Sequence, residues 1–253
     1  MAQKKEELEK ETRENNQYFL MKEITQIRKL SLWIFFIPFI AINLCLFISQ
    51  NYELLNNTIF AVDMIGRSGF SIPYFDGSLS ISRASRTFPQ YLIFKPSMFL
   101  TSILLFYYWK NNNLLINQLN FTNINYKFKT FGILSAFFLV VHSLLLGIKF
   151  DIQIYKLFRR VVLLAFIIFE IIAQGILVYH FFKVKDKLKN FVNKNILILK
   201  IVLVGLMSTV AILSLPILLT KDNTHFKHAL EWNYFVGVIT FYLFSRFFWR
   251  RTT

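Results

Sequence analysis

The side chains that could do chemistry gather in one polar, turn-rich segment, residues 69–91, with the sequence GFSIPYFDGSLSISRASRTFPQY. Guanidinium groups bind phosphate and carboxylate groups through two parallel hydrogen bonds, so the two arginines of this segment could hold a lipid headgroup. The serines and the aspartate could instead make the short-range hydrogen bonds that fix turns and helix starts. The headgroup-binding candidates of the segment are Asp76, Ser80, Arg83 and Arg86.

A second polar group, His225, His228 and Glu231, stands near the end of the chain. With Asp76 and a serine of residues 69–91, His228 could form a Ser–His–Asp hydrolase. That chemistry needs the three groups within hydrogen-bond reach, and the sequence has no Gly-x-Ser-x-Gly turn to present a nucleophile. Zinc needs more ligands than two histidines, and no HExxH or paired CxxC motif is present. We predict no catalytic residue, metal or other cofactor, and we add His228 and Glu231 to the headgroup-binding candidates.

The elements that must position these groups are apolar. Hydrophobic residues make up 55% of the 253 residues and charged residues only 17%, gathered between apolar runs. Each run is close to the roughly 20 residues that cross a bilayer as a helix. The six runs lie at residues 31–50, 92–110, 130–149, 159–182, 197–220 and 232–249. We predict an all-α polytopic membrane protein, a bundle of six transmembrane helices over residues 31–253, with Glu231 in the first turn of the last helix.

The charged residues indicate how the chain is oriented. Residues 1–30 carry seven basic and six acidic side chains and read as a charged helix that leads into the first span. With this segment inside, the cytoplasmic segments carry 19 basic residues and the outer segments 10, a bias that favours both termini in the cytoplasm. The longest outer loop is then residues 51–91. The net charge of +15 belongs to this asymmetry and does not indicate nucleic-acid binding, because the aromatic residues lie within the apolar runs.

Three polar side chains inside the predicted spans could form an intramembrane site. Glu170 is the one acidic residue there, and buried carboxyl groups usually face the bundle interior and have a partner. Gln174 lies four residues further along the same helix face. His142, in the neighbouring span, is predicted to lie at a similar depth and to contact Glu170. The three residues could form a proton-linked or headgroup site, or they could form interhelical hydrogen bonds that fix the fold.

The order of elements resembles a known family. A first span, a long loop with a PY pair and an SxSxSR element, and five closely spaced helices resemble the DRAM-like family of six-span membrane proteins. This family includes the Sfk-like proteins, the CWH-type N-terminal region and the post-GPI-attachment remodelling factors. The resemblance covers about residues 31–249 and is carried by Pro73, Tyr74, Ser78, Ser80, Ser82, Arg83, His228, Glu231 and Trp232.

The short motifs also depart from those of the family. Arg83-Ala-Ser-Arg86 stands where the remodelling factors continue with Ala-Ala-Ile-Gly, and Phe75-Asp76-Gly77 stands where the DRAM proteins read Ile-Ser-Asp. The resemblance implies that residues 228–231 lie beside residues 69–91. It also implies a role in membrane lipid handling, with GPI-anchor remodelling ahead of lipid organisation or autophagy.

These observations favour an integral membrane protein with a non-enzymatic role in GPI-anchor lipid remodelling or membrane lipid organisation. Its expected partners are membrane lipids and GPI-anchored or other membrane proteins. Two alternatives stay open, a membrane acyl-hydrolase or transferase acting on lipid from the outer face, and a small transporter that uses Glu170. The expected membrane is that of the Golgi, ER, lysosome or cell surface in a eukaryote, or the inner membrane in a bacterium.

Overall fold

The computed structural model describes residues 2–61, 69–119, 127–148, 153–186, 188–189, 191–220 and 222–250. Six long helices make up most of this part of the chain: α1 (Ala2–Gln50), α4 (Gln90–Gln118), α5 (Lys127–Leu145), α6 (Gln153–Val184), α7 (Lys194–Leu219) and α8 (Thr224–Phe248). The short helices η1 (Tyr52–Leu55), α2 (Pro73–Asp76) and α3 (Ile81–Ser85) lie between α1 and α4. No β-strand occurs in these ranges, which confirms the all-α prediction.

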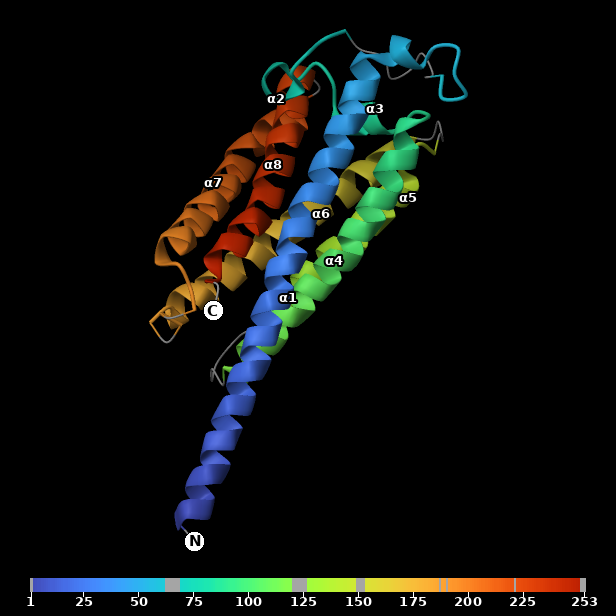
Figure 1. The fold of residues 1–253 in the computed structure, drawn as a ribbon. Helices are drawn as coiled ribbons and strands as arrows, with labels where there is room; N and C mark the ends of the chain where they lie inside the picture. The colour runs from blue at the N-terminus through green and yellow to red at the C-terminus, as the bar shows by residue number, and fades with distance from the viewer. Residues whose placement is uncertain are drawn as a thin grey trace.

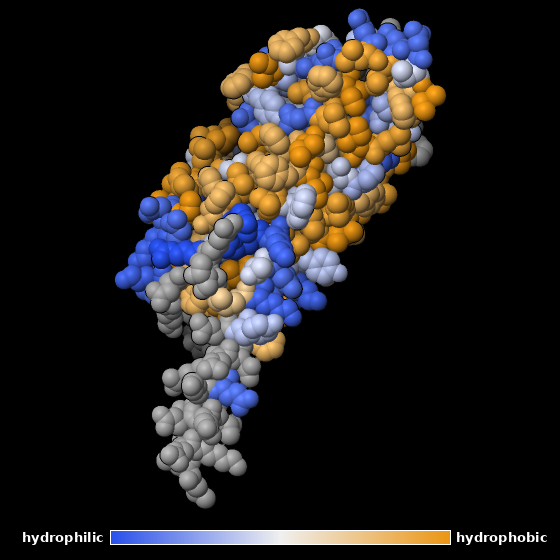
Figure 2. All heavy atoms as spheres, in the orientation of Figure 1, coloured by the Kyte–Doolittle hydropathy of each residue, from blue (hydrophilic) through white to orange (hydrophobic). Residues whose placement is uncertain are grey.

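Five of the described helices are long and apolar enough to span a membrane, over Tyr18–Gln50, Gln90–Gln118, Lys127–Leu145, Gln153–Val184 and Lys194–Ser214. On the face that Figure 2 shows, apolar side chains cover the middle of the molecule and polar side chains gather towards its two ends. The sixth predicted span lies on α8. This helix has 25 residues, enough to cross a bilayer, but it falls short of the apolar composition that marks the other five.

The six long helices pack as a closed ring in sequence order. α1 packs on α4, α4 on α5, α5 on α6, α6 on α7 and α7 on α8, and α8 returns to α1. From α4 to α8 the connections between neighbouring helices are short, which favours antiparallel packing. The 49 residues of α1 reach about 74 Å at 1.5 Å per residue, so its N-terminal part extends well beyond the other helices (Figure 1).

The two short helices α2 and α3 cover one end of this ring, which we call the α2–α3 end. α2 packs on α8, while α3 contacts α1, α4 and α8. In Figure 1 α2 lies beside the start of α8, although the two are about 150 residues apart in the chain. The polar segment is therefore held against the bundle by its own helices and does not hang free.

The last helix begins earlier than predicted. α8 starts at Thr224, so His228 and Glu231 lie inside it, and the prediction that Glu231 occupies its first turn is wrong. Apolar runs mark the part of a helix that can lie in hydrocarbon, and a polar turn outside that part can stay helical. As a result, His228, Glu231 and Trp232 share one helical face at spacings of three and four residues.

Candidate functional site

The polar segment docks onto α8 through its own backbone carbonyl groups. His228 Nδ1 donates to Gly77 O at 3.0 Å, and Trp232 Nε1 donates to Leu79 O at 2.7 Å. Asn233 Nδ2 donates to Tyr74 O at 2.9 Å, and the Tyr74 and Trp232 rings pack 4.7 Å apart. The structure thus brings residues 69–91 and the 228–231 region together, as the sequence resemblance implies.

His228 has a structural part in this contact. A carbonyl oxygen can only accept a hydrogen bond, so the proton of the neutral imidazole lies on Nδ1. Burial lowers the pKa of His228. The hydrogen bond to Gly77 raises this pKa and the positive charge of Arg83 lowers it, and burial is the largest of these effects. A neutral His228 that is committed to Gly77 is poorly placed to activate a serine.

Glu231 and Ser80 cap the same short helix. The Ser80 hydroxyl accepts from Arg83 N at 3.1 Å as the N-cap of α3. The Glu231 carboxyl of α8 lies near the backbone N–H groups of Ser82 and Ile81, which lower its pKa against the effect of burial. Free N–H groups at a helix start are normally satisfied in this way. Both candidates therefore hold α3 in place.

Asp76 fixes the turn between α2 and α3. Its carboxylate accepts from Ser78 N at 2.8 Å and from Ile72 N at 2.9 Å. These bonds, with the Ser78 contacts foremost, lower the pKa of Asp76 below its usual value. The Asp76 carboxylate is therefore used to stabilise the backbone of this turn and not to orient a catalytic histidine.

The arginines of the segment meet a third arginine that the sequence analysis did not select. Arg159 of α6 donates from Nη2 to the Ser82 hydroxyl at 3.1 Å. Burial lowers the pKa of Arg86, and the charges of Arg83 and Arg159 lower it further. Arg83 and Arg159 are thus both near enough to Arg86 for their charges to affect it, and we call these three residues the arginine cluster. One sequence feature could have indicated Arg159. The Arg159–Arg160 pair lies on the predicted outer side, where the positive-inside rule predicts few basic residues.

The arginine cluster has no anion of its own within the described ranges. None of its three guanidinium groups forms an ion pair there, and Arg159 Nε is buried without a hydrogen-bond partner. Three like charges that are held together repel one another and keep unused donors. The arrangement can bind a phosphate or carboxylate group, which would supply both the opposite charge and the acceptors.

Serines and histidines near this end are used separately. Ser80 caps α3, Ser82 accepts from Arg159, and His228 donates to Gly77. Among the described residues of this end, no serine hydroxyl is hydrogen-bonded to a histidine, and no group of three His, Cys, Asp or Glu side chains could hold a metal ion. The geometry thus favours capping and binding over the Ser–His–Asp alternative.

Glu170 lies in a separate network in the bundle interior. Ser135 of α5 and Tyr242 of α8 donate to its two carboxyl oxygens, and Gln174 Nε2 donates at 3.0 Å. Gln174 also donates to Val238 O at 3.3 Å. Gln174 shares the helix face of Glu170, as the four-residue spacing predicts, and the hydrogen bonds of the network tie α5, α6 and α8 together.

The predicted contact between Glu170 and His142 is wrong. Glu170 meets α5 at Ser135, seven residues before His142, which places the histidine about 10 Å further towards the α2–α3 end. His142 is buried there, close enough to Arg159 to be affected by its charge, and its Nδ1 has no hydrogen-bond partner. Sequence spacing places residues on neighbouring spans only to within a few turns.

A buried lysine was also missed. Lys200 of α7 is 1% exposed, donates from Nζ to the Ser245 hydroxyl at 2.8 Å and lies 4.0 Å from the centre of the Phe241 ring. Ser245 donates in turn to Phe241 O, so Tyr108, 3.0 Å away, acts as a further donor to Ser245. The signal was the position of Lys200 inside the apolar sequence NILILKIVLV, since lysine rarely lies within a span without a polar neighbour.

Comparisons of the chain with protein-family models, with curated proteins and with solved structures found no match. The DRAM-like family therefore remains a prediction from the residues that carry the resemblance. The function must be argued from the geometry of the arginine cluster and the groups around it.

Proposed function

We propose that this protein is a membrane lipid-binding protein that holds the anionic headgroup of a lipid at the arginine cluster, without catalysing a reaction on it. The observation that carries the proposal is the grouping of Arg83, Arg86 and Arg159 with no ion-pair partner in the described chain. The guanidinium group of arginine can donate two parallel hydrogen bonds to the oxygens of one phosphate group. The cluster lies at the end of an apolar bundle, the level at which lipid headgroups sit.

The location of the cluster supports a lipid as the source of this anion. Arg159 lies near the start of α6, whose apolar part is long enough to span a membrane, and Ser82 and Arg86 lie in the segment that covers the same end. We propose that α8 is the sixth span and that both termini face the cytoplasm. The cluster then faces the outer leaflet, in keeping with the charge bias of the sequence.

The biological process is proposed on the resemblance alone. A DRAM-like protein of this kind would act in GPI-anchor lipid remodelling or in membrane lipid organisation, with GPI-anchored or other membrane proteins as partners. A phosphate-binding site without a nucleophile suits a factor that presents or organises a lipid. An endomembrane or cell-surface location follows from this process in a eukaryote.

The headgroup proposal can be tested with purified protein in phosphatidylcholine nanodiscs that contain phosphatidylglycerol. We expect bound phosphatidylglycerol, measured by native mass spectrometry, to be enriched over its share of the nanodisc. Arg159→Gln and Arg86→Gln should each weaken this binding about tenfold or more, because a hydrogen bond to a charged group contributes about 1.5–3 kcal/mol. Arg160→Gln is the matched control, since Arg160 is exposed and outside the cluster. Equal enrichment in all four proteins would refute the proposal.

A further inference from the structure

An elongated apolar cavity runs along the inside of the helix ring. It is lined by α1, α4, α5, α6 and α8 together with Ile81 of α3, and it holds about 710 Å³ of atom-free space, including the part open to its surroundings. One side of α8 faces it along its length, through Glu231, Tyr234, Phe235, Val238, Ile239 and Tyr242. The spacing of three and four residues shows that a single stripe of this helix forms one wall.

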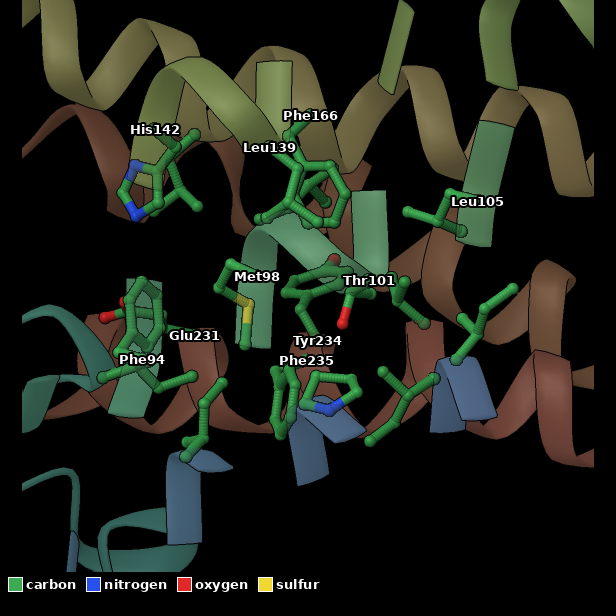
Figure 3. A pocket seen from close by; sticks show the side chains of 18 of the residues that line it. Phe94, Met98, Thr101, Leu105, Leu139, His142, Phe166, Glu231, Tyr234 and Phe235 are labelled. Atoms are coloured by element: carbon green, nitrogen blue, oxygen red, sulfur yellow. The ribbon is translucent and has the colours of Figure 1, made fainter. Parts of the chain in front are cut away.

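The cavity has two chemically different ends. Figure 3 shows His142 and Glu231 at one end and Leu105 at the other, with Met98 and Thr101 between them. The end with His142 and Glu231 is the α2–α3 end of the bundle. From Glu231 to Tyr242 the wall is about 16 Å long at 1.5 Å per residue, the length of roughly a dozen methylene groups in an extended chain.

The polar end of the cavity adjoins the arginine cluster. Ile81 lines the cavity, and the next residue, Ser82, accepts the hydrogen bond of Arg159. His142 lines the cavity too and is close enough to Arg159 to be affected by its charge. A molecule with an anionic group on the cluster could therefore extend an apolar chain into the cavity without leaving the protein.

The lining suits a chain of methylene groups. Its tyrosine hydroxyls are already used, because Tyr242 donates to Glu170 and Tyr234 donates to Met207 O at 3.1 Å. The rings of Phe94, Phe166 and Phe235 also line the cavity. Sites for polar ligands usually present several precisely placed polar groups, and the middle of this cavity offers mainly the Thr101 hydroxyl, which already donates to Ser97 O.

We propose that the cavity holds one acyl chain of the anionic lipid whose headgroup is bound by the arginine cluster. This inference rests on the proposed function and names the part of the lipid that enters the protein. The α8 wall, about 16 Å long, matches a single chain of roughly a dozen methylene groups lying along this helix. The second chain of a diacyl lipid would lie outside, against the apolar faces of the helices.

The test uses phosphatidylglycerol and phosphatidylcholine that carry the same photoreactive diazirine acyl chain, in nanodiscs with the full-length protein. After irradiation, mass spectrometry identifies the labelled residues. We expect the phosphatidylglycerol chain to label Met98, Leu139 or Val238 in the cavity. Val238→Trp, which fills the cavity, should reduce this labelling at least about fivefold, whereas Val202→Trp, the same change on an exposed position of α7, should leave it unchanged.

The outcomes separate this inference from the headgroup proposal. Labelling confined to membrane-facing residues such as Val202, with phosphatidylglycerol enrichment still dependent on Arg159, overturns the acyl-chain inference and leaves the headgroup site standing. Equal labelling of the cavity by both lipids, unaffected by Arg159→Gln, overturns the headgroup site and with it the assignment of the chain to an anionic lipid. The labelling of the wild-type protein decides the matter even if Val238→Trp fails to fold.

Discussion

The α-carbon of Gly77 lies directly against the main chain of His225, so that a Cβ on Gly77 would stand 1.7 Å from the His225 carbonyl oxygen. Gly77 also has a φ of +59°, a left-handed conformation that side-chain-bearing residues adopt at a cost of about 1–2 kcal/mol. This one position lets the polar segment reach α8 and form the His228 and Trp232 hydrogen bonds. Two independent requirements therefore call for glycine here.

Gly77→Ala should loosen the docking of residues 69–91. We expect a loss of at least about 2 kcal/mol in unfolding free energy, because the strained φ is joined by a clash with backbone that cannot turn away. Thermal unfolding in detergent, followed by tryptophan fluorescence, measures the effect. Gly69→Ala is the matched control, since a Cβ at Gly69 meets nothing within 4 Å. An equal, small effect of both changes would mean that the segment does not depend on this contact.

The Glu170 network predicts a contrast between two substitutions. Ser135, Tyr242 and Gln174 all donate to this carboxyl group. Glu170→Gln keeps an acceptor and nearly the same shape, so we expect a loss of no more than about 1 kcal/mol. Glu170→Leu leaves buried donors without an acceptor and should lose about 3 kcal/mol or more. Unfolding midpoints in detergent distinguish the two.

The same pair of variants also tests the transporter alternative. If Glu170 only fixes the fold, Glu170→Gln protein in liposomes should retain its proton and ion permeability unchanged. A Gln variant that is stable but has lost a flux shown by the wild-type protein would instead give Glu170 a transport role.

Apolar run length was enough to predict where the long helices lie. A run near 20 residues between charged loops has few alternatives to a spanning helix, because backbone polar groups must be satisfied internally in lipid. The docking of residues 69–91 against residues 228–231 was also foreseen, although from a resemblance and not from physical reasoning. Hydropathy could not find the start of α8 at Thr224, because the polar turns before Trp232 form a helix outside the apolar run.

The meeting of side chains from different helices was harder to predict. Arg159 comes near Arg83 and Arg86 because the start of α6 reaches Ser82 of α3, and nothing local in the sequence predicts that approach. The same limit explains His142, which lies two turns from the position that would contact Glu170. A displacement of two helical turns is only about seven residues in the sequence. It is enough to decide which polar side chains of neighbouring helices are in contact.

Lys200 should be replaceable by an apolar residue of similar shape. Its Nζ group has one hydroxyl partner and two aromatic rings, Phe241 and Phe248, but no ion pair within the described chain. Burying an amine without a carboxylate partner is unfavourable, so Lys200→Met should leave the melting temperature unchanged or raise it. Lys200→Ala should lower stability by about 2 kcal/mol or more through the cavity it leaves.

The control for Lys200 is the exposed lysine at the start of the same helix. Lys194 pairs with Asp186 at 3.6 Å on the surface, and such pairs contribute about 0–1 kcal/mol, so Lys194→Met should have little effect. A large loss of stability in Lys200→Met alone would contradict the expectation. It would mean that the Ser245 hydrogen bond and the ring contacts outweigh the loss of solvation.

Glu231 should make the stability of the protein depend on pH. It precedes the apolar part of α8, and burial raises the pKa of its carboxyl from the ordinary 4.5 to about 7, against the Ile81 and Ser82 N–H groups that lower it. Between these two values the folded protein binds more protons than the unfolded chain, so stability falls as the pH rises.

Glu231→Gln removes this titration and keeps an acceptor for α3. We therefore expect the melting temperature of the wild-type protein to fall relative to that of Glu231→Gln between about pH 5 and pH 8. His142 and His228 face the same region and are unchanged in both proteins, so the difference between the two curves isolates Glu231. Parallel curves would show that the carboxyl is charged throughout this range.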